Sequence, residues 1–433
     1  MSRNTLTWTV LLALSAGCGI LDTEQPDIIV PGDLDNEAGA RSKRIGAISE
    51  FTFAKDGDGN GAADGQILMS GLMSDEFNLS TTPPTQQEID QRAVNINNVS
   101  VTTTYFQMHR ARSTAEDAAQ ALQDFLPDPD GEAAIPEMLS LSGFTYVYFA
   151  ETFCSGVPFS RAVGDSLILG SSITTAATLD TAIARFDSAL AHAGIAADAN
   201  VEYLARIGRA RALLDQGLFA EAGAEAALVP TDFSYVTEHA QTPFILQNVI
   251  FTNSDGGLFS LADLEGGNGL PYRSADDPRV PFFDTGDVGL DGSTPQFNLL
   301  KYPDPGAPVP VADGIEARLI EAEAAYQAGS FGPMIALLDS VRGLIGLPGV
   351  TDPGTASGRE DLLFSERAFW LFATGHRLGD MRRLLRQYGR TESAVFPIGP
   401  YLKGGSYGTD VNIPIPIEEQ NNPNFQGCID RLP

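Results

Sequence analysis

Residues 365–380 read SERAFWLFATGHRLGD, and the fold prediction starts from them. From residue 359 to residue 388 apolar residues recur at helical spacing, which places them on one face. Gly375 and Gly379 interrupt the run, so the pattern predicts two packed helices with a tight bend between them. Alternating charges along both helices favour ion pairs near the bend, from Glu366, Arg367, His376, Arg377, Asp380, Arg382 and Arg383.

After these helices, residues 391–433 form a strip rich in glycine, proline and asparagine. Val395-Phe396-Pro397 precedes a glycine-rich turn, then NIPIPIEE at residues 412–419 and NNPN at residues 421–424. Proline at alternate positions is excluded from a central strand, so we expect an extended strip across the surface of a larger body.

The order of these motifs resembles the C-terminal signature of the SusD/RagB family. The signature here is ER-x-F-W-x(4)-G-x-R-x-x-D-x-R-R from residue 366, followed by FP, N-x-P-I-P-x-x-E and N-P. The resemblance implies a lipoprotein on the cell surface that pairs with a TonB-dependent, SusC-like transporter of the outer membrane. It also implies a SusD-like fold.

The N-terminus has the features of an export signal, residues 1–17. Arg3 gives a basic start, and residues 8–14 form an apolar core too short to span a bilayer. Residues 15–18, SAGC, resemble a lipobox, although Ser15 stands where leucine is usual. We predict lipidation of Cys18, with plain secretion as the alternative, and a lipidated tether over residues 18–35.

Composition and net charge bear on the number of domains and on the kinds of partner that the protein can bind. The 433 residues are 43% hydrophobic, which is enough for a large core and predicts one large domain or two intimately packed ones. The family resemblance implies a single SusD-like domain over residues 36–433. The net charge of -29 argues against a nucleic-acid partner, whose phosphates would be repelled, and against a basic membrane-binding surface.

Two further cysteines, Cys154 and Cys428, remain in an exported chain, where a disulfide can persist. A bridge would tie the C-terminal tail to the helix that ends near Glu151; the alternative is two separately buried thiols. Neither cysteine has a Cys or His at ligand spacing, so we predict no metal site there.

Helical hairpins dominate about 101–229 and 314–390. Helices are expected over residues 36–53, 104–125, 135–153, 179–193, 201–216, 218–229, 314–328 and 331–345. Small residues at the crossings, such as Ala205 and Gly208, resemble tetratricopeptide repeats. The fold class is therefore mainly α, a tetratricopeptide-like scaffold with a loop-rich insert and few short strands.

Two acidic features precede the hairpins. Residues 56–61, DGDGNG, match the first half of a calcium loop, but Ile67 stands where the bidentate Glu belongs. Calcium binding at Asp56 to Asn60 therefore stays open beside a flexible acidic turn. Asp75 and Glu76 are interpreted as structural, and residues 78–98 as a long surface loop.

The insert, about 230–310, is rich in Gly, Pro, Asp and aromatic residues, and residues 244–251 suit short strands. Such a segment on a helical frame is where we expect a ligand site. Exposed aromatic rings stack on sugars or peptide side chains, whereas buried ones pack the core. The candidate ligand-binding residues are Tyr235, Tyr272, Phe282, Phe283 and Tyr302.

No catalytic motif emerges. The four histidines lack zinc-helix spacing, and neither a nucleophile elbow nor a phosphate loop is present. We therefore predict a protein that is not an enzyme and needs no cofactor, although a two-carboxylate hydrolase stays open.

The leading hypothesis is a lipid-anchored outer-membrane protein, facing the cell exterior, that captures an oligomeric nutrient, glycan or peptide. It would act as a lid and deliver the nutrient to the TonB-dependent transporter. The alternative is a tetratricopeptide-type envelope scaffold without a nutrient ligand, for which the insert would be dispensable.

Overall fold

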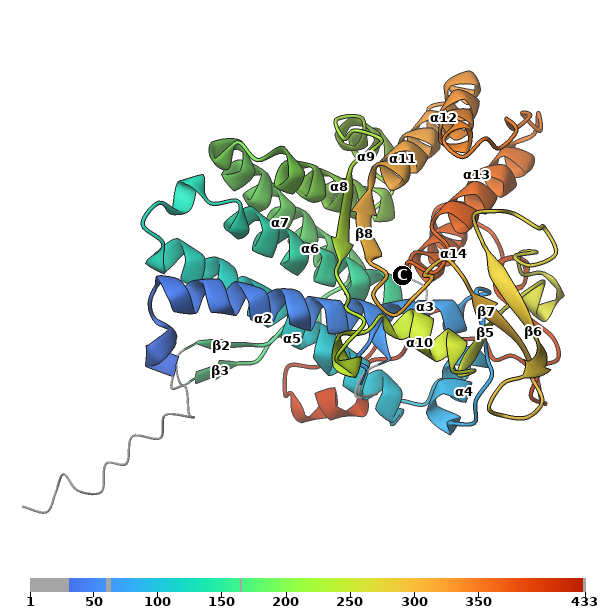
Figure 1. Ribbon diagram of the computed structural model, residues 1–433, viewed down its shortest axis with the longest axis horizontal. Helices are drawn as coiled ribbons and strands as arrows, with labels where there is room; N and C mark the ends of the chain where they lie inside the picture. Colours follow the sequence, from blue (N-terminus) through green and yellow to red (C-terminus); the bar gives the residue numbers. More distant parts are fainter. Residues whose placement is uncertain (1–30, 60–63, 164–165, 431–433) are drawn as a thin grey trace, which may run out of the picture.

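The computed structural model describes residues 31–59, 64–163 and 166–430, which form the mainly helical body that was predicted (Figure 1). The signal peptide, Cys18 and most of the tether lie outside the described residues. Within these ranges, no helix is long and apolar enough to cross a bilayer. The α-helices of the described ranges are α2 (Glu37–Asp56), α3 (Gly65–Met73), α4 (Pro84–Asp90), α5 (Val99–Phe125), α6 (Ala134–Thr152), α7 (Thr175–Ala196), α8 (Ala199–Asp215), α9 (Phe219–Ala226), α10 (Val249–Asp255), α11 (Gly314–Gln327), α12 (Phe331–Gly343), α13 (Ala356–Trp370), α14 (Arg377–Arg386) and α15 (Glu392–Val395).

One half of the molecule is an array of side-by-side helices. Figure 1 shows α2, α5, α6, α7 and α8 stacked in succession, and the array continues through α9, α11 and α12. Small residues set the spacing: a Cβ on Gly143 of α6 or Gly208 of α8 would come within 2.7 or 2.2 Å of the Phe186 ring of α7. Three helices can therefore close on one buried phenylalanine.

The predicted helices exist, with shifted ends. The helix expected over residues 104–125 begins at Val99, because Asn98 caps it by accepting a hydrogen bond from the Val101 amide. The surface loop expected over residues 78–98 is wrong. It contains most of β1 (Phe77–Leu79) and all of α4, and the Asp90 side chain is buried, where it accepts from the Leu79 amide.

A pair of strands joins the two ends of the insert. β4 (Ser234–Thr237) and β8 (Val309–Asp313) are antiparallel and bring the two ends of the insert together. Further pairs join β1 to β5 (Phe259–Leu261) and β6 (Phe282–Val288) to β7 (Pro295–Leu299), while β2 (Arg161–Val163) and β3 (Ser166–Ile168) form a separate hairpin. Residues 244–251, expected as short strands, instead form a 3-10 turn and the start of α10.

The proline-containing strip follows the surface only in part: residues 398–410 and 417–430 are mostly exposed or half-buried, whereas the segment between them enters the interior. Residues 411–416 are all buried. The Ile413 amide donates to the Thr152 carbonyl, and the Cys154 amide donates to the Ile413 carbonyl, both at 2.9 Å. Pro414 and Pro416 have no N–H to donate, whereas Ile413 keeps the N–H that pairs with the end of α6.

Candidate ligand site

The bend between α13 and α14 is held by buried arginine–carboxylate pairs. Arg367 donates two hydrogen bonds to Asp380, each of 2.9 Å, and Arg383 donates to the same carboxylate at 2.6 Å. Arg383 also pairs with Glu323 of α11. Burial by itself would raise the pKa of Asp380, yet the two guanidinium groups hold it well below its usual range. We call these four side chains the clasp.

The backbone of the bend, residues 371–376, is fixed by side chains from distant parts of the chain. The Lys301 ammonium donates to the Phe372 carbonyl at 2.5 Å, near the C-terminal end of α13, where a cation is favoured. Nearby, Arg377 pairs with Asp75 at 2.6 and 2.9 Å, a structural role for that carboxylate. The side chains from other parts of the chain that hydrogen-bond this backbone are Gln66, Glu76, Lys301 and Tyr302.

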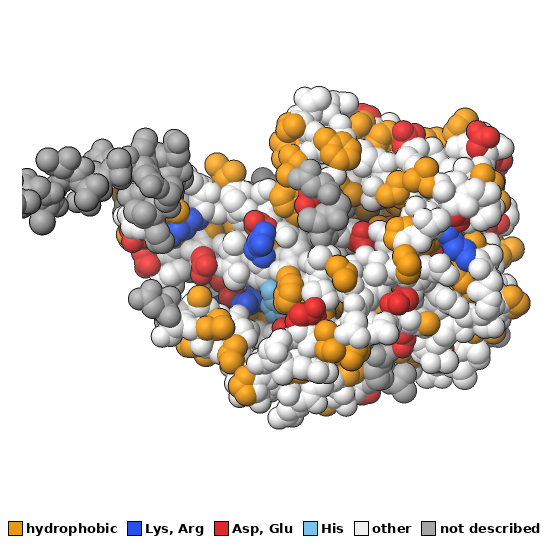
Figure 2. Space-filling view, turned by 90° about the horizontal axis from the view of Figure 1, so that it is seen from below, with side chains coloured by type: hydrophobic (Ala, Val, Ile, Leu, Met, Phe, Trp, Pro, Cys, Tyr) orange, Lys and Arg blue, Asp and Glu red, His pale blue; other side chains and the backbone are white. Residues whose placement is uncertain are grey.

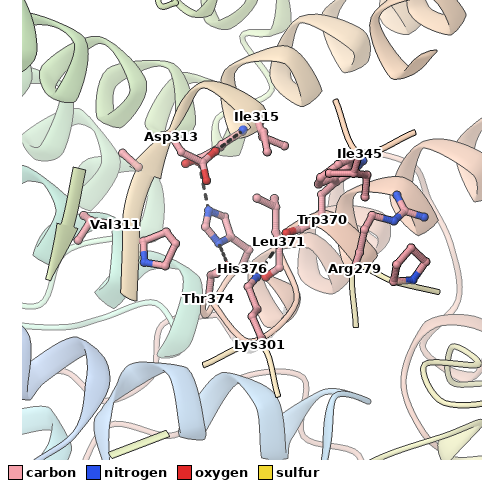
Figure 3. A pocket seen from close by; sticks show the side chains of 14 residues that line it. Arg279, Lys301, Val311, Asp313, Ile315, Ile345, Trp370, Leu371, Thr374 and His376 are labelled. Carbon is pink, nitrogen blue, oxygen red and sulfur yellow. Dashed lines mark hydrogen bonds and ion pairs between the residues drawn. The ribbon is translucent and has the colours of Figure 1, made fainter. Parts of the chain in front are cut away.

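A pocket of about 270 Å³ opens between this bend and the insert (Figure 3). Its floor is buried, whereas Ile345 at its mouth is 49% exposed. Trp370, the last residue of α13, is half-buried in its wall, and its indole Nε1 makes no hydrogen bond within the described part of the chain. The polar side chains on the walls are Arg279, Lys301, Asp313, Glu316, Thr374 and His376.

His376 lies at the back of the pocket in a defined tautomer. The Thr374 hydroxyl donates to the Leu371 carbonyl, so it accepts from His376 Nδ1, 2.7 Å away. Nε2 is left as an acceptor and faces Glu316 Oε1 at 3.2 Å, without the angles of a hydrogen bond. Burial lowers the pKa of His376 well below its ordinary value, which makes the ring neutral at neutral pH.

Burial shifts the pKa values of the carboxyl and ammonium groups on the pocket walls so that their neutral forms are favoured. Burial raises the pKa of Glu316 to about 7 and lowers that of Lys301 to about 8. Burial also raises the pKa of Asp313, which caps α11 by accepting from the Glu316 amide at 2.8 Å. The pocket therefore offers hydrogen-bond donors and acceptors beside an indole ring.

No known family profile matches the sequence, and no curated protein is significantly similar to it. Solved structures are similar over nearly the whole chain. Surface glycan-binding protein A from Bacteroides uniformis matches with a TM-score of 0.70 and 15% identity, covering 91% of this chain and 99% of that chain. A SusD superfamily protein from Bacteroides vulgatus gives 0.65 and 14%, with 92% and 99% covered. A laminarin-binding SusD-like protein gives 0.66 and 15%, with 91% and 99% covered.

The chain has the SusD-like fold. The resemblance found in the C-terminal motifs is thereby confirmed at the level of fold. In this SusD-like chain those motifs supply the clasp and part of the pocket.

The structure separates the five predicted aromatic residues. Tyr272 and Tyr302 are 0% and 2% exposed, so no face of either ring is open to a ligand. Tyr235 is half-buried on β4, and its hydroxyl donates to Glu137 at 2.9 Å. Phe282 is half-buried, and its neighbour Phe283 is 56% exposed. None of the five lines the pocket, and Phe283 is the one most open to a ligand.

The two remaining cysteines are brought together. Cys154 follows α6, and its Cα lies 5.8 Å from that of Cys428, the usual separation in a disulfide. Around them the Ile429 amide donates to the Ser155 carbonyl at 2.7 Å. We propose that this pair forms a disulfide in the exported protein, joining the tail to α6.

The first residue of the acidic turn is already engaged by other side chains. Asp56 is the last residue of α2, and its buried carboxylate is engaged by Lys55 at 2.9 Å and by Thr237 at 2.5 Å. Asn60 lies outside the described residues. Among those described, no group of three or more His, Cys, Asp or Glu side chains is placed to hold a metal ion.

Sequence reasoning missed the pocket itself. Trp370 belongs to the apolar helical pattern of residues 359–388, which predicts packing, and its position immediately before the bend is the one signal in the sequence that sets it apart. Lys301 and Glu316 lie about 70 and 60 residues before the bend in sequence, and no spacing rule connects them to His376 (Figure 3).

Proposed function

We propose that this SusD-like protein binds an oligosaccharide at the cell surface and delivers it to a TonB-dependent, SusC-like transporter in the outer membrane. The observation that carries the proposal is the likeness to surface glycan-binding protein A over 99% of that chain's length. A match that covers 91% of this chain must extend into the insert of about 80 residues, and the insert supplies Arg279 and Lys301 to the pocket.

The chemistry of the pocket supports a glycan more than a peptide. Sugars present apolar C–H faces that stack on aromatic rings, and hydroxyls that both donate and accept hydrogen bonds. Trp370 offers a ring and an unpartnered N–H, and Glu316 and His376 offer acceptors. Binding of this kind requires no bond to be made or broken.

Attachment to the membrane is proposed to come from acyl chains on Cys18. The face seen in Figure 2 carries hydrophobic side chains in small groups among acidic and polar ones, as on surfaces that meet water. An anchor at the N-terminus with a polar tether would hold such a body close to the membrane.

The experiment is to purify the lipidated protein from the outer membrane in mild detergent and identify its partners by mass spectrometry. We expect a stoichiometric β-barrel transporter, and loss of membrane attachment for Cys18→Ala. Recovery of soluble periplasmic proteins alone would contradict the proposal and favour the scaffold alternative. A Cys428→Ser variant, which loses the proposed disulfide but keeps the lipobox, should stay attached to the membrane.

A further inference from the structure

We propose that the pocket between the insert and the bend takes one uncharged sugar unit at the end of a glycan chain. This inference rests on the proposed function, and it specifies which part of the ligand enters and with what charge. Size, shape, charge and unpartnered polar atoms support it in turn.

The size of the pocket suits a single sugar ring. Pockets for drug-sized ligands measure roughly 300–1,000 Å³, and this one, at about 270 Å³, lies just below that range. A longer segment of glycan therefore cannot be contained in it, and further units must lie outside.

The shape of the pocket favours a chain end. Leu371, Thr374 and His376 close one side and are each at most 5% exposed. The exposed residues lie at the other side, where Ile345 and Pro278 form the mouth. A chain that entered in its middle would need two exits, whereas a terminal unit needs one.

The wall charges are already compensated. Arg279 donates to Asp277 at 2.7 and 2.9 Å and to Glu366 at 2.7 Å, which occupies its guanidinium. Lys301 donates to two backbone carbonyls at the end of α13. An acidic sugar would therefore meet no free cation, and its carboxylate would approach Asp313 and Glu316 instead.

Polar atoms without partners point to hydroxyl groups as the ligand. In the described structure Trp370 Nε1, Glu316 Oε1 and His376 Nε2 make no hydrogen bond, and Glu316 and His376 are 1% and 5% exposed. Buried groups of this kind are costly unless they are satisfied. A sugar hydroxyl both donates and accepts, so it matches an unpartnered acceptor such as His376 Nε2 as well as an unpartnered donor such as Trp370 Nε1.

The first experiment uses monosaccharides as probes. Saturation-transfer NMR of the full mature chain is recorded with glucose, galactose, mannose, N-acetylglucosamine and, as the charged counterpart, glucuronate. We expect at least one neutral sugar to bind and glucuronate to bind at least tenfold more weakly. The inference would be overturned if none of the neutral sugars binds, or if glucuronate binds as tightly as they do.

The second experiment closes the mouth of the pocket. Ile345→Trp adds bulk at an exposed position, so folding is preserved, and should weaken sugar binding at least tenfold. Leu344→Trp is the matched control, because Leu344 is 57% exposed and does not line the pocket. Equal loss in both variants, or in neither, would refute a role for the pocket.

The third experiment tests for chain ends. Each polysaccharide that the protein binds is cut by limited endo-hydrolysis, which raises the number of chain ends at constant mass. Per unit mass, the cut polysaccharide should then inhibit monosaccharide binding more strongly than the intact one. If inhibition does not rise, or if oligosaccharides bind wild type and Ile345→Trp equally, only the pocket inference fails. If no oligosaccharide binds at all, the proposed function fails as well.

Discussion

The helical array and the insert with its bend are built on different principles. In the array, α5 to α8 bury apolar side chains against neighbours close in sequence, and glycines at the crossings set the spacing. Around the bend, polar side chains from α3, the insert and α11 converge over separations of 60 to 309 residues. Periodic apolar packing makes the first half predictable, whereas the second half depends on particular long-range pairs.

The largest expected effect comes from breaking the clasp. Asp380→Ala leaves Arg367 and Arg383 buried with one partner fewer, and breaking a buried pair in this way costs about 3–5 kcal/mol. Urea unfolding followed by circular dichroism measures the loss. The control is the pair of Asp352, which is exposed, and Arg359, which is half-buried, and Asp352→Ala should leave the unfolding midpoint nearly unchanged. Equal midpoints for both variants would show that the clasp contributes little.

A smaller loss is expected when the helical array is overpacked. Gly208→Ala places a methyl group 2.2 Å from the Phe186 ring, so helices α7 and α8 must shift. Overpacking of this kind costs about 1–3 kcal/mol. Gly194→Ala on α7 is the control, since nothing lies within 4 Å of its added Cβ. A loss of stability in Gly194→Ala equal to that in Gly208→Ala would rule out the crossing as the cause.

The clasp and the crossing at Gly208 show which parts of the structure can be predicted from the sequence. Helical spacing predicts the helices, and Gly208 is identified as a small residue at a crossing, because buried positions recur along a helix at a fixed spacing. The clasp motif was recognised too, but not its partner Glu323, one of 56 acidic residues. Tyr302 was a candidate ligand-binding residue because it lies in the loop-rich insert. Its ring is instead buried, and its hydroxyl donates to the Ala373 carbonyl at 2.8 Å.

A still smaller change in stability is expected when the pH is raised, because of the buried carboxyl group of Glu76. Burial raises the pKa of Glu76 to about 8, so the folded protein keeps a proton that the unfolded chain loses above its ordinary pKa. The unfolded state binds fewer protons between these values, so stability falls as pH rises. From pH 6 to 7.5 the wild type should lose at most about 2 kcal/mol relative to Glu76→Gln. Parallel stability curves for the two proteins would refute this.

The smallest effect on stability is expected at Phe283, which tests whether the insert contributes binding surface outside the pocket. The ring is 56% exposed, so Phe283→Ala should change the free energy of unfolding by less than about 0.5 kcal/mol. Because an exposed ring can stack on sugar units beyond the first, the Kd for oligosaccharides should rise several-fold while monosaccharide binding stays the same. Calorimetric titration with both ligand lengths measures this, with Leu290→Ala, another exposed insert residue, as control. Unchanged oligosaccharide affinity would confine the ligand contacts to the pocket, and the exposed aromatic of the insert would then have no part in binding.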